Sequence, residues 1–236
     1  MSQAETEHKA AEPELRDFNA HPEAAVEART RNLQASLNQQ ASLLHEVGHR
    51  ANNNLQLISS LMLLQSRQTD DPAVAEALKR MQQRLSALSI AHRLLFQTTE
   101  AGQCDMAALI GELARDLAAA EPELKIALDL DLEPVKAPAA QAAAIALLLG
   151  DLIDHAFRQA RLTGRERSVR INLRRGEDGA VIEIADDGTG MSEPPAGFRM
   201  TIVTLLSRQL SATVGFAQRP REIARIDLPL APAAGG

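Results

Sequence analysis

The stretch HEVGHRANNNLQ, residues 45–56, places eight polar side chains in the middle of an apolar pattern. The segments on either side, SLL and LISSLMLL, are mainly apolar. Apolar residues also continue through the stretch at spacings of three or four over residues 33–62, which predicts one long amphipathic helix. The polar residues therefore form either a solvated helix face or a face on which His45 or His49 does chemistry.

A second apolar stripe follows a short break in the pattern. The segment SRQTDDP, residues 66–72, ends the first stripe, and Pro72 suits the first turn of a new helix. Apolar residues then recur over residues 74–95, so the two stripes predict a helical hairpin within residues 23–100. Because a hairpin buries only one seam, we expect two copies to pair as a four-helix bundle, which makes the chain a homodimer. The alternative is a coiled coil used only for dimerisation.

The composition limits the class of protein. Of 236 residues, 45% are hydrophobic but only 2% are aromatic, so the core is built from aliphatic side chains. The single cysteine, Cys104, excludes a disulfide framework and a cysteine-built zinc site. A net charge of -6 argues against a nucleic-acid partner. No apolar run approaches the ~20 residues that span a bilayer and no signal peptide is visible, so we expect a cytoplasmic protein without a membrane partner.

The remaining chain divides into a tail and a second domain. Residues 1–22 are polar and contain two prolines, which predicts a flexible tail. Residues 105–234 contain segments with the helical spacing and segments that alternate like strands. This mixture predicts an α+β sandwich with a mostly antiparallel sheet. The helices are expected at 105–120, 139–160 and 197–210, and the strands at 124–132, 168–175, 180–187, 213–218 and 223–230.

The helical period places His49 on the polar face. At roughly 100° per residue it points about 140° away from the buried stripe, and Asn53 and Gln56 fall within about 40° of it. Glu46 also points outward, one turn earlier, and Arg50 follows His49 directly. A neutral imidazole, with an ordinary pKa of about 6.5, is a good nucleophile for phosphoryl transfer near pH 7. Arg50 can neutralise charge, and Asn53 or Gln56 can orient an oxygen or a water.

These residues carry a resemblance to a known family. The run EVGHRANNNLQ followed by ISSLMLLQ resembles the dimerisation and phosphoacceptor helix of two-component histidine kinases related to the HWE group. The second helix continues the likeness through Arg84 and His92. The resemblance implies that His49, and not His45, is the phosphoacceptor. For His92 the simpler interpretation is a capping or packing residue.

Residues 105–234 resemble the ATP-binding domain of the same family, which also occurs in gyrase and Hsp90-type chaperones and has the Bergerat, or GHKL-like, sandwich fold. One nucleotide motif is kept. In the run ADDGTGM, Asp186, Gly188 and Gly190 match the residues that contact adenine in the family. An acidic turn of ordinary function gives the same pattern.

The other nucleotide motifs depart from the family. In the helix that should supply a magnesium-binding asparagine, Gly150 and His155 stand at the two asparagine positions and Asp151 at the glutamate position. Magnesium prefers hard oxygen ligands and accepts imidazole poorly. Arg199 stands where a phosphate-cradling glycine is expected, and the segment MSEPPA is short for a nucleotide lid. We therefore expect a degenerate domain that binds no ATP and no metal.

Three functions are compatible with these observations. The first is a histidine phosphotransferase in a phosphorelay, which passes a phosphoryl group through His49 between receiver domains of response regulators. The second is an active histidine kinase that uses ATP and magnesium to phosphorylate His49. The third is a pseudokinase, or a phosphatase that uses Asn53 or Gln56 to position water. The partners expected are receiver domains, a second copy of the chain and an upstream histidine kinase.

Overall fold

The computed structural model describes residues 3–97, 102–120, 126–162, 167–186, 198–216 and 224–230. The chain divides into two compact units, residues 1–49 and residues 50–236. The boundary falls inside the first helix rather than between the predicted hairpin and the second domain. Most of the predicted hairpin therefore belongs to the same unit as the sandwich.

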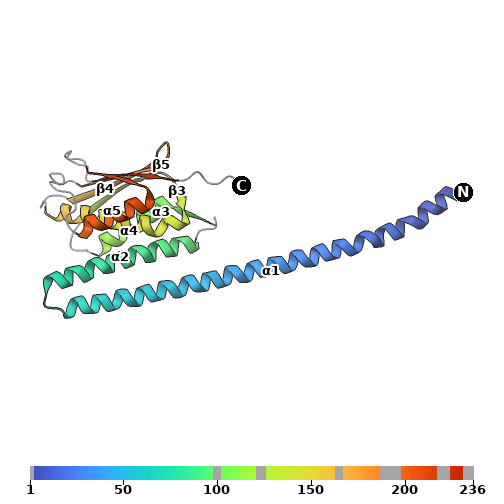
Figure 1. Cartoon of the computed structure of the whole chain (residues 1–236), viewed down its shortest axis with the longest axis horizontal. Helices are drawn as coiled ribbons and strands as arrows, with labels where there is room; N and C mark the ends of the chain where they lie inside the picture. Colours follow the sequence, from blue (N-terminus) through green and yellow to red (C-terminus); the bar gives the residue numbers. More distant parts are fainter. Residues whose placement is uncertain are drawn as a thin grey trace. The chain divides into compact units, whose positions relative to one another are not determined.

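Two long helices form where the apolar stripes predict them. Helix α1 spans Gln3–Gln68 and helix α2 spans Pro72–Gln97, and both are labelled in Figure 1. Asp71 caps α2, because its Oδ1 accepts a hydrogen bond of 2.8 Å from the backbone N–H of Ala73. Residues 3–22, for which the sequence predicted a flexible tail, lie within α1. Pro13 and Pro22 therefore lie inside a helix, against their usual preference.

The second domain contains a five-stranded sheet with the order β2-β4-β5-β7-β6. Strands β2 and β4 pair in parallel and the other pairs are antiparallel, which agrees with the predicted, mostly antiparallel sheet. A separate two-stranded sheet, β1 with β3, was not predicted. The strands are β1 (Gln103–Asp105), β2 (Ile126–Leu132), β3 (Lys136–Pro138), β4 (Arg167–Arg175), β5 (Gly179–Asp186), β6 (Thr213–Gly215) and β7 (Ala224–Pro229).

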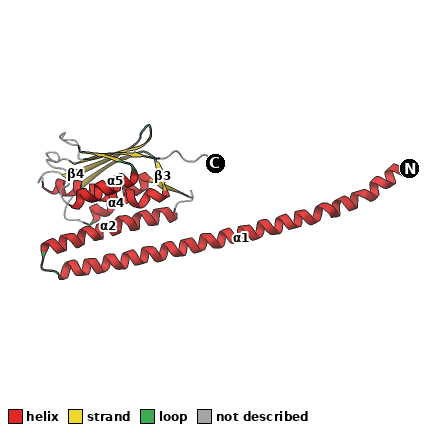
Figure 2. Cartoon of the chain, viewed as in Figure 1, coloured by secondary structure: helices red, strands yellow, loops and turns green. Residues whose placement is uncertain are grey.

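Helices cover one face of this sheet, as Figure 2 shows. They are α3 (Met106–Ala119), the short 3-10 helix η1 (Ala139–Gln141), α4 (Ala142–Leu162) and α5 (Phe198–Leu210). Alternate residues of β5 and β7 are buried against the helices, and the core is aliphatic, as the composition predicted. Asp105 caps α3 through a 3.0 Å hydrogen bond from the backbone N–H of Ala108. The domain is the expected mixture of helix and sheet.

Helix α4 corrects one expectation from the sequence. The run Ala139–Ala160 is long and apolar enough to cross a membrane by length and composition, with a mean hydropathy of 1.3. Its most apolar window is 61% buried inside the domain, however, as in the core helix of a globular protein. The prediction that no run reaches this length was therefore wrong, because a core helix that packs on several sides is apolar around most of its circumference.

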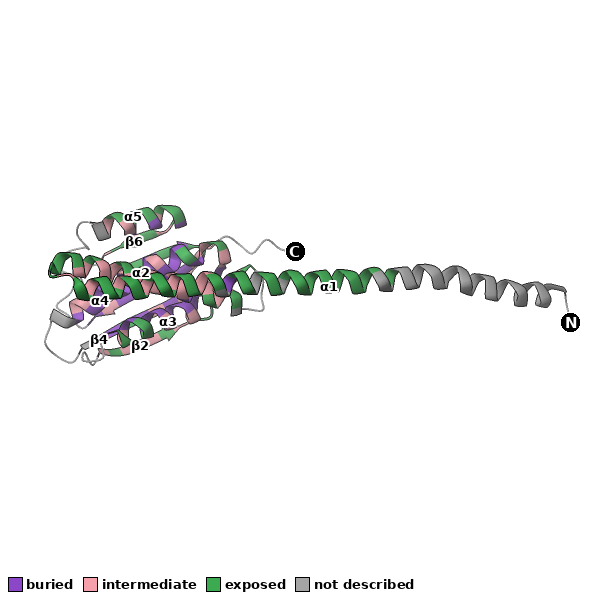
Figure 3. Cartoon of the chain, turned by 90° about the horizontal axis from the view of Figure 1, so that it is seen from below, coloured by how far each residue is buried: buried purple, intermediate pink, exposed green. Residues whose placement is uncertain are grey.

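Apolar side chains remain exposed on the two long helices. Figure 3 shows exposed residues in green along α1. In the second unit, Leu57, Leu61 and Leu64 form a row on α1 with 65, 62 and 53% of their surfaces exposed. Val74 and Met81, seven residues apart on α2, are also exposed. This row differs from the predicted stripe, in which Leu55 and Met62 are half-buried and Ile58 is 44% exposed.

Candidate functional site

The polar stretch that opened the sequence lies in helix α1. In the first unit Glu46 is exposed, and in the second unit Arg50, Asn53 and Gln56 are each exposed. The backbone of His49 is helical, but the side chains of His45 and His49 lie outside the described part of the structure. Asn52, which sequence reasoning did not single out, is half-buried, with its Oδ1 shielded from solvent. Glu46, Arg50, Asn53 and Gln56 are thus exposed, and their role beside His49 stays a prediction.

Helix α2 carries two further residues of the family pattern, Arg84 and His92, and these two side chains make different contacts. Arg84 points at α4, where its Nε and Nη2 donate hydrogen bonds of 3.1 and 2.8 Å to the two carboxylate oxygens of Asp151. His92 is partly buried, and its ring lies 5.0 Å from that of Phe96 between ring centroids. This ring contact one turn along α2 fits the packing role expected for His92.

Helix α4 presents the positions that should bind nucleotide in the family. A Cβ atom at Gly150 would lie 3.4 Å from the Cβ of Ala87 on α2, so the two helices come close together at this glycine. The carboxylate of Asp151 is bonded to Arg84 as described above. His155 is buried, and its Nε2 lies 3.4 Å from the side-chain nitrogen of Gln159. Thus Gly150 and Asp151 take part in packing of α4 against α2.

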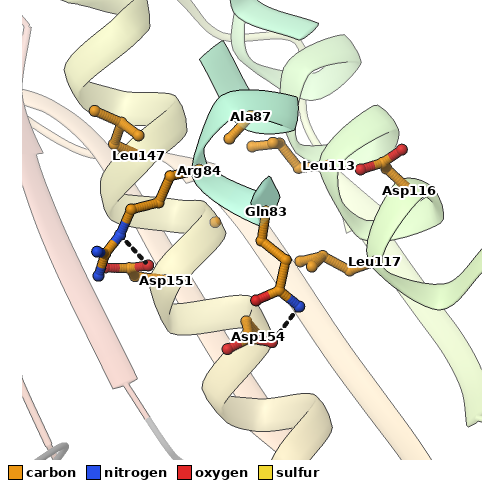
Figure 4. A pocket seen from close by; sticks show the side chains of 10 residues that line it. Gln83, Arg84, Ala87, Leu113, Asp116, Leu117, Leu147, Asp151 and Asp154 are labelled. Atoms are coloured by element: carbon orange, nitrogen blue, oxygen red, sulfur yellow. Dashed lines mark hydrogen bonds and ion pairs between the residues drawn. The ribbon is translucent and has the colours of Figure 1, made fainter. Parts of the chain in front are cut away.

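Further polar contacts surround this packing, and Figure 4 shows one of them, between Gln83 and Asp154, beside the pair Arg84–Asp151. Gln83 donates a 2.9 Å hydrogen bond to Asp154, and Arg158 donates one of the same length to the second carboxylate oxygen of Asp154. Arg158 also forms an ion pair with Glu76 of α2. The cavity beside these groups, between α2, α3 and α4, has a volume of about 10 Å³, room for no more than one water molecule.

A weak signal for this network is present in the sequence. Asp151, Asp154 and Arg158 are spaced by three and four residues, so they occupy one face of an otherwise apolar helix. Charged residues are rarely buried without partners, and α2 carries Glu76 and Arg84 on its own inward face. Complementary charges on two predicted helices indicate an interface between them, although not which charges pair.

The adenine motif is described only at its start. Asp186 ends strand β5 and is buried, with 2% of its surface exposed. Gly188 and Gly190, together with the predicted lid, lie outside the described residues, and so does the side chain of Arg199. Within the described residues, no group of three or more His, Cys, Asp or Glu side chains is arranged to hold a metal ion. The possible adenine contact at Asp186 therefore stays a prediction.

Comparisons with known proteins find similarity to histidine kinases. Residues 46–121 match the family model HisKA_2, described as histidine kinase. The sensor histidine kinase PdtaS of Mycobacterium tuberculosis is 27% identical over 186 residues, which are 73% of this chain and 36% of that protein. PdtaS of Mycolicibacterium smegmatis is 26% identical over 189 residues, 79% of this chain and 37% of that protein. The chain thus spans little more than a third of the length of these relatives.

These matches support a relationship between this chain and the histidine kinase family. A solved histidine kinase domain, from the blue-light activated histidine kinase of Erythrobacter litoralis, superimposes with a TM-score of 0.60 at 22% identity. The superposition covers 82% of this chain and 95% of that domain. A second structure of the Erythrobacter kinase gives the same TM-score at 19% identity, over 77% of this chain and 59% of that one. The fold of this chain is therefore that of a histidine kinase domain, with its GHKL-like sandwich.

Acid is expected to weaken the contacts between α2 and α4 through Glu76. Burial alone would raise the pKa of this carboxyl, but Arg158 and, more weakly, Arg80 hold it below its ordinary value of 4.5. A carboxyl with a lowered pKa in the folded state stabilises the fold above its ordinary pKa, and this stabilisation is lost as the pH falls through the lowered value. In urea unfolding, Glu76→Gln should therefore reduce stability at pH 7, and the reduction should shrink as the pH falls below 4.5.

The same substitution at Glu177, an exposed residue in the turn between β4 and β5, is the matched control. Its effect on the free energy of unfolding should change less with pH than that of Glu76→Gln. Equal pH dependence of the two variants would contradict the role assigned to Glu76.

Proposed function

We propose that this chain is a histidine phosphotransferase in a two-component phosphorelay. His49 receives a phosphoryl group from the aspartyl phosphate of one receiver domain and passes it to an aspartate of another. Glu46, Arg50, Asn53 and Gln56 assist on the same helix face. The proposal includes a homodimer, a cytoplasmic location and response regulators as partners, and it assigns no bound nucleotide or metal to the sandwich.

The proposal rests on the contacts that this chain makes at the positions where the family binds nucleotide. Gly150 provides no oxygen for magnesium and lies against Ala87, and the carboxylate of Asp151 accepts two hydrogen bonds from Arg84. A kinase site needs oxygen ligands on this helix that are free to face the nucleotide and its magnesium ion. The phosphoacceptor segment, in contrast, is retained, and the histidine kinase family match covers it from Glu46 onward. A phosphoacceptor without a nucleotide site is a relay component.

The reaction is balanced without any further reactant. A lone pair on one ring nitrogen of neutral His49 attacks the phosphorus atom, and a nitrogen–phosphorus bond forms. The bond between phosphorus and the aspartate oxygen breaks, and the carboxylate leaves with the electron pair. In the second half-reaction the carboxylate of another receiver attacks the phosphorus, and the imidazole leaves. Such transfers depend mainly on positioning and on neutralisation of the phosphoryl charge.

The neighbouring residues suit these two requirements. Arg50 directly follows His49 and is exposed, so its guanidinium can approach the phosphoryl oxygens. Asn53 and Gln56, one and two turns further along, offer amide groups to the same face. Glu46 lies one turn before His49, where its carboxylate can accept the N–H of the second ring nitrogen and fix the tautomer.

The proposed dimer follows from the exposed row on the hairpin. Leu57, Leu61 and Leu64 are spaced by four and three residues, which is the spacing of a bundle seam. Val74 and Met81 extend the apolar surface onto α2. A second copy of the hairpin brings the same row to the interface, so that two-fold symmetry closes a four-helix bundle.

An active histidine kinase is the second candidate. It is favoured by the relatives, which are sensor histidine kinases, and by Asp186, which is buried at the end of β5 where the family contacts adenine. In that case ATP and magnesium would be required, and label would move from ATP to His49.

One experiment separates the candidates. The full chain is incubated either with ATP labelled at the γ-phosphate and magnesium, or with isolated receiver domains labelled by acetyl phosphate. We expect label on the chain from at least one receiver and none from ATP. Label from ATP on the wild type, absent in His49→Ala, would contradict the phosphotransferase and support the kinase. Release of free phosphate from a receiver by His49→Ala would instead support a phosphatase.

A further inference from the structure

The contacts between α2 and α4 limit how far the sandwich can move relative to α2. They comprise the ion pair Arg84–Asp151, the hydrogen bond Gln83–Asp154, the ion pairs of Arg158 with Glu76 and Asp154, and the close approach of Gly150 to Ala87. We call this set the α2–α4 lock. We infer that the lock stays closed during phosphoryl transfer, so that the sandwich remains fixed against α2 rather than acting as a mobile catalytic domain.

The first argument is the burial and geometry of the central ion pair. The side chains of Arg84 and Asp151 keep only 17 and 12% of their surfaces exposed. The guanidinium bonds both carboxylate oxygens, and such bidentate pairs are stronger and more specific in direction than single contacts. Opening the lock without a replacement partner would leave both charges without their compensation. The pair therefore favours one fixed docking position.

The second argument is steric. Ala87 is buried, and a Cβ added at Gly150 would lie 3.4 Å from the Cβ of Ala87, which is van der Waals contact. A larger side chain, such as the asparagine that stands at this position in the family, would need additional room beside α2. The glycine that removes an oxygen ligand therefore also permits α2 to pack closely on α4. One change in the sequence accounts for both observations.

The third argument is the number of independent polar contacts along α2. Beyond the lock, Ser86 donates a 2.7 Å hydrogen bond to Asp116 of α3, and Arg93 donates one of 2.6 Å to Glu112. The contacts thus run from Glu76 to Arg93, over most of the length of α2. A domain that must swing to deliver a phosphoryl group would have to break all of them in each cycle.

A disulfide tests the inference directly. A Cβ at residue 150 would lie 3.4 Å from that of Ala87, just below the range of about 3.5–4.5 Å found in disulfides, so a shift of about 0.1 Å lets the pair Ala87→Cys and Gly150→Cys form one. The native thiol interferes little, because burial and, to a lesser extent, Asp105 raise the pKa of Cys104 to about 11. It is nevertheless replaced by alanine in all variants. The pair Ala77→Cys and Gly150→Cys is the control, since residue 77 lies about 15 Å further along α2.

We expect the 87–150 pair to oxidise within one chain, seen as loss of two free thiols without a covalent dimer, and the 77–150 pair to stay reduced. Transfer from receivers labelled with acetyl phosphate should then be equal in the oxidised and reduced forms within about twofold. Failure to oxidise within one chain, a disulfide between two chains, or transfer that is lost on oxidation and regained on reduction would each overturn the inference.

The activity readout depends on the proposed function, whereas disulfide formation does not. If the wild type accepts no label from any receiver, the proposed function fails while the thiol measurement still decides whether the lock is closed. A second set of variants provides a readout independent of cysteine. Arg84→Ala should lower the melting temperature by roughly 6 to 12 °C, and exchanging the two charges with Arg84→Asp and Asp151→Arg should restore part of it.

The matched control is Arg170→Ala. Arg170 pairs with Asp129 on the outer face of the sheet at 2.5 Å, but both side chains are about half exposed, so the loss should be less than about 4 °C. A loss for Arg84→Ala no greater than that for Arg170→Ala would show that the central ion pair does not hold the lock closed.

Discussion

Replacing His49 by alanine is expected to remove phosphoryl transfer to and from the chain, by at least roughly a thousandfold relative to wild type. The reason is that the imidazole is consumed and regenerated in each cycle, so no neighbouring group can substitute for it. The exposed residues around it offer a carboxylate, a guanidinium and amides, and none of these forms an equivalent nitrogen–phosphorus bond. Rapid-quench transfer from a labelled receiver measures the rate.

His45→Ala is the control for this substitution. His45 lies one turn earlier on α1, has the same side chain and falls in the same polar stretch. Its replacement should leave the transfer rate within about twofold of wild type, because the family resemblance assigns the phosphoryl group to His49 alone. If His45→Ala abolished transfer and His49→Ala did not, the assignment of the two histidines would be reversed.

Introducing aspartate at both Leu57 and Leu61 is expected to convert the proposed dimer to a monomer. Burying one leucine side chain contributes about 1.5–3 kcal/mol, and the two substitutions act on both copies. The dissociation constant should therefore rise by at least about 10⁴-fold before any repulsion between the new charges is counted. Light scattering should show a mass that falls from twice 25.5 kDa to 25.5 kDa.

The control is Arg67→Asp, which places the same side chain on α1 but about 80° around the helix from Leu57 and about 120° from Leu61. It should remain dimeric. The double leucine variant should also keep the fold of the sandwich, because both leucines are more than 60% exposed within the single chain. A wild type that is monomeric at all concentrations would refute the proposed bundle, and so would a leucine variant that remains dimeric.

Much of the fold could be predicted because its signals are local. Pro72 and Asp71 mark the start of α2, Asp105 marks the start of α3, and alternation marks the strands β4 and β5. The short strands β1 and β3 could not be predicted, since three residues are too few to show a period. The helix at residues 3–22 was missed because two prolines were given more weight than the helix propensity around them.

The candidate site likewise has a part that the sequence predicts and a part that it does not. His49 and the polar face around it follow from helical spacing and from the resemblance. The pairing of Arg84 with Asp151 joins residues 67 positions apart, and no local pattern specifies it. The sequence indicated correctly that the positions of Gly150 and Asp151 are altered, but not that they have a new packing role against α2. That role depends on the approach of two helices, which only the tertiary structure provides.

The central claim is that His49 carries a phosphoryl group received from an aspartyl phosphate. The most direct measurement is to incubate the full chain with a phosphorylated receiver, digest it at alkaline pH where phosphohistidine persists, and locate the phosphate by mass spectrometry. The account predicts phosphate on His49, and on no other residue. Phosphate on His45 or His92, or a chain that takes no phosphate from any receiver but takes it from ATP, would contradict it.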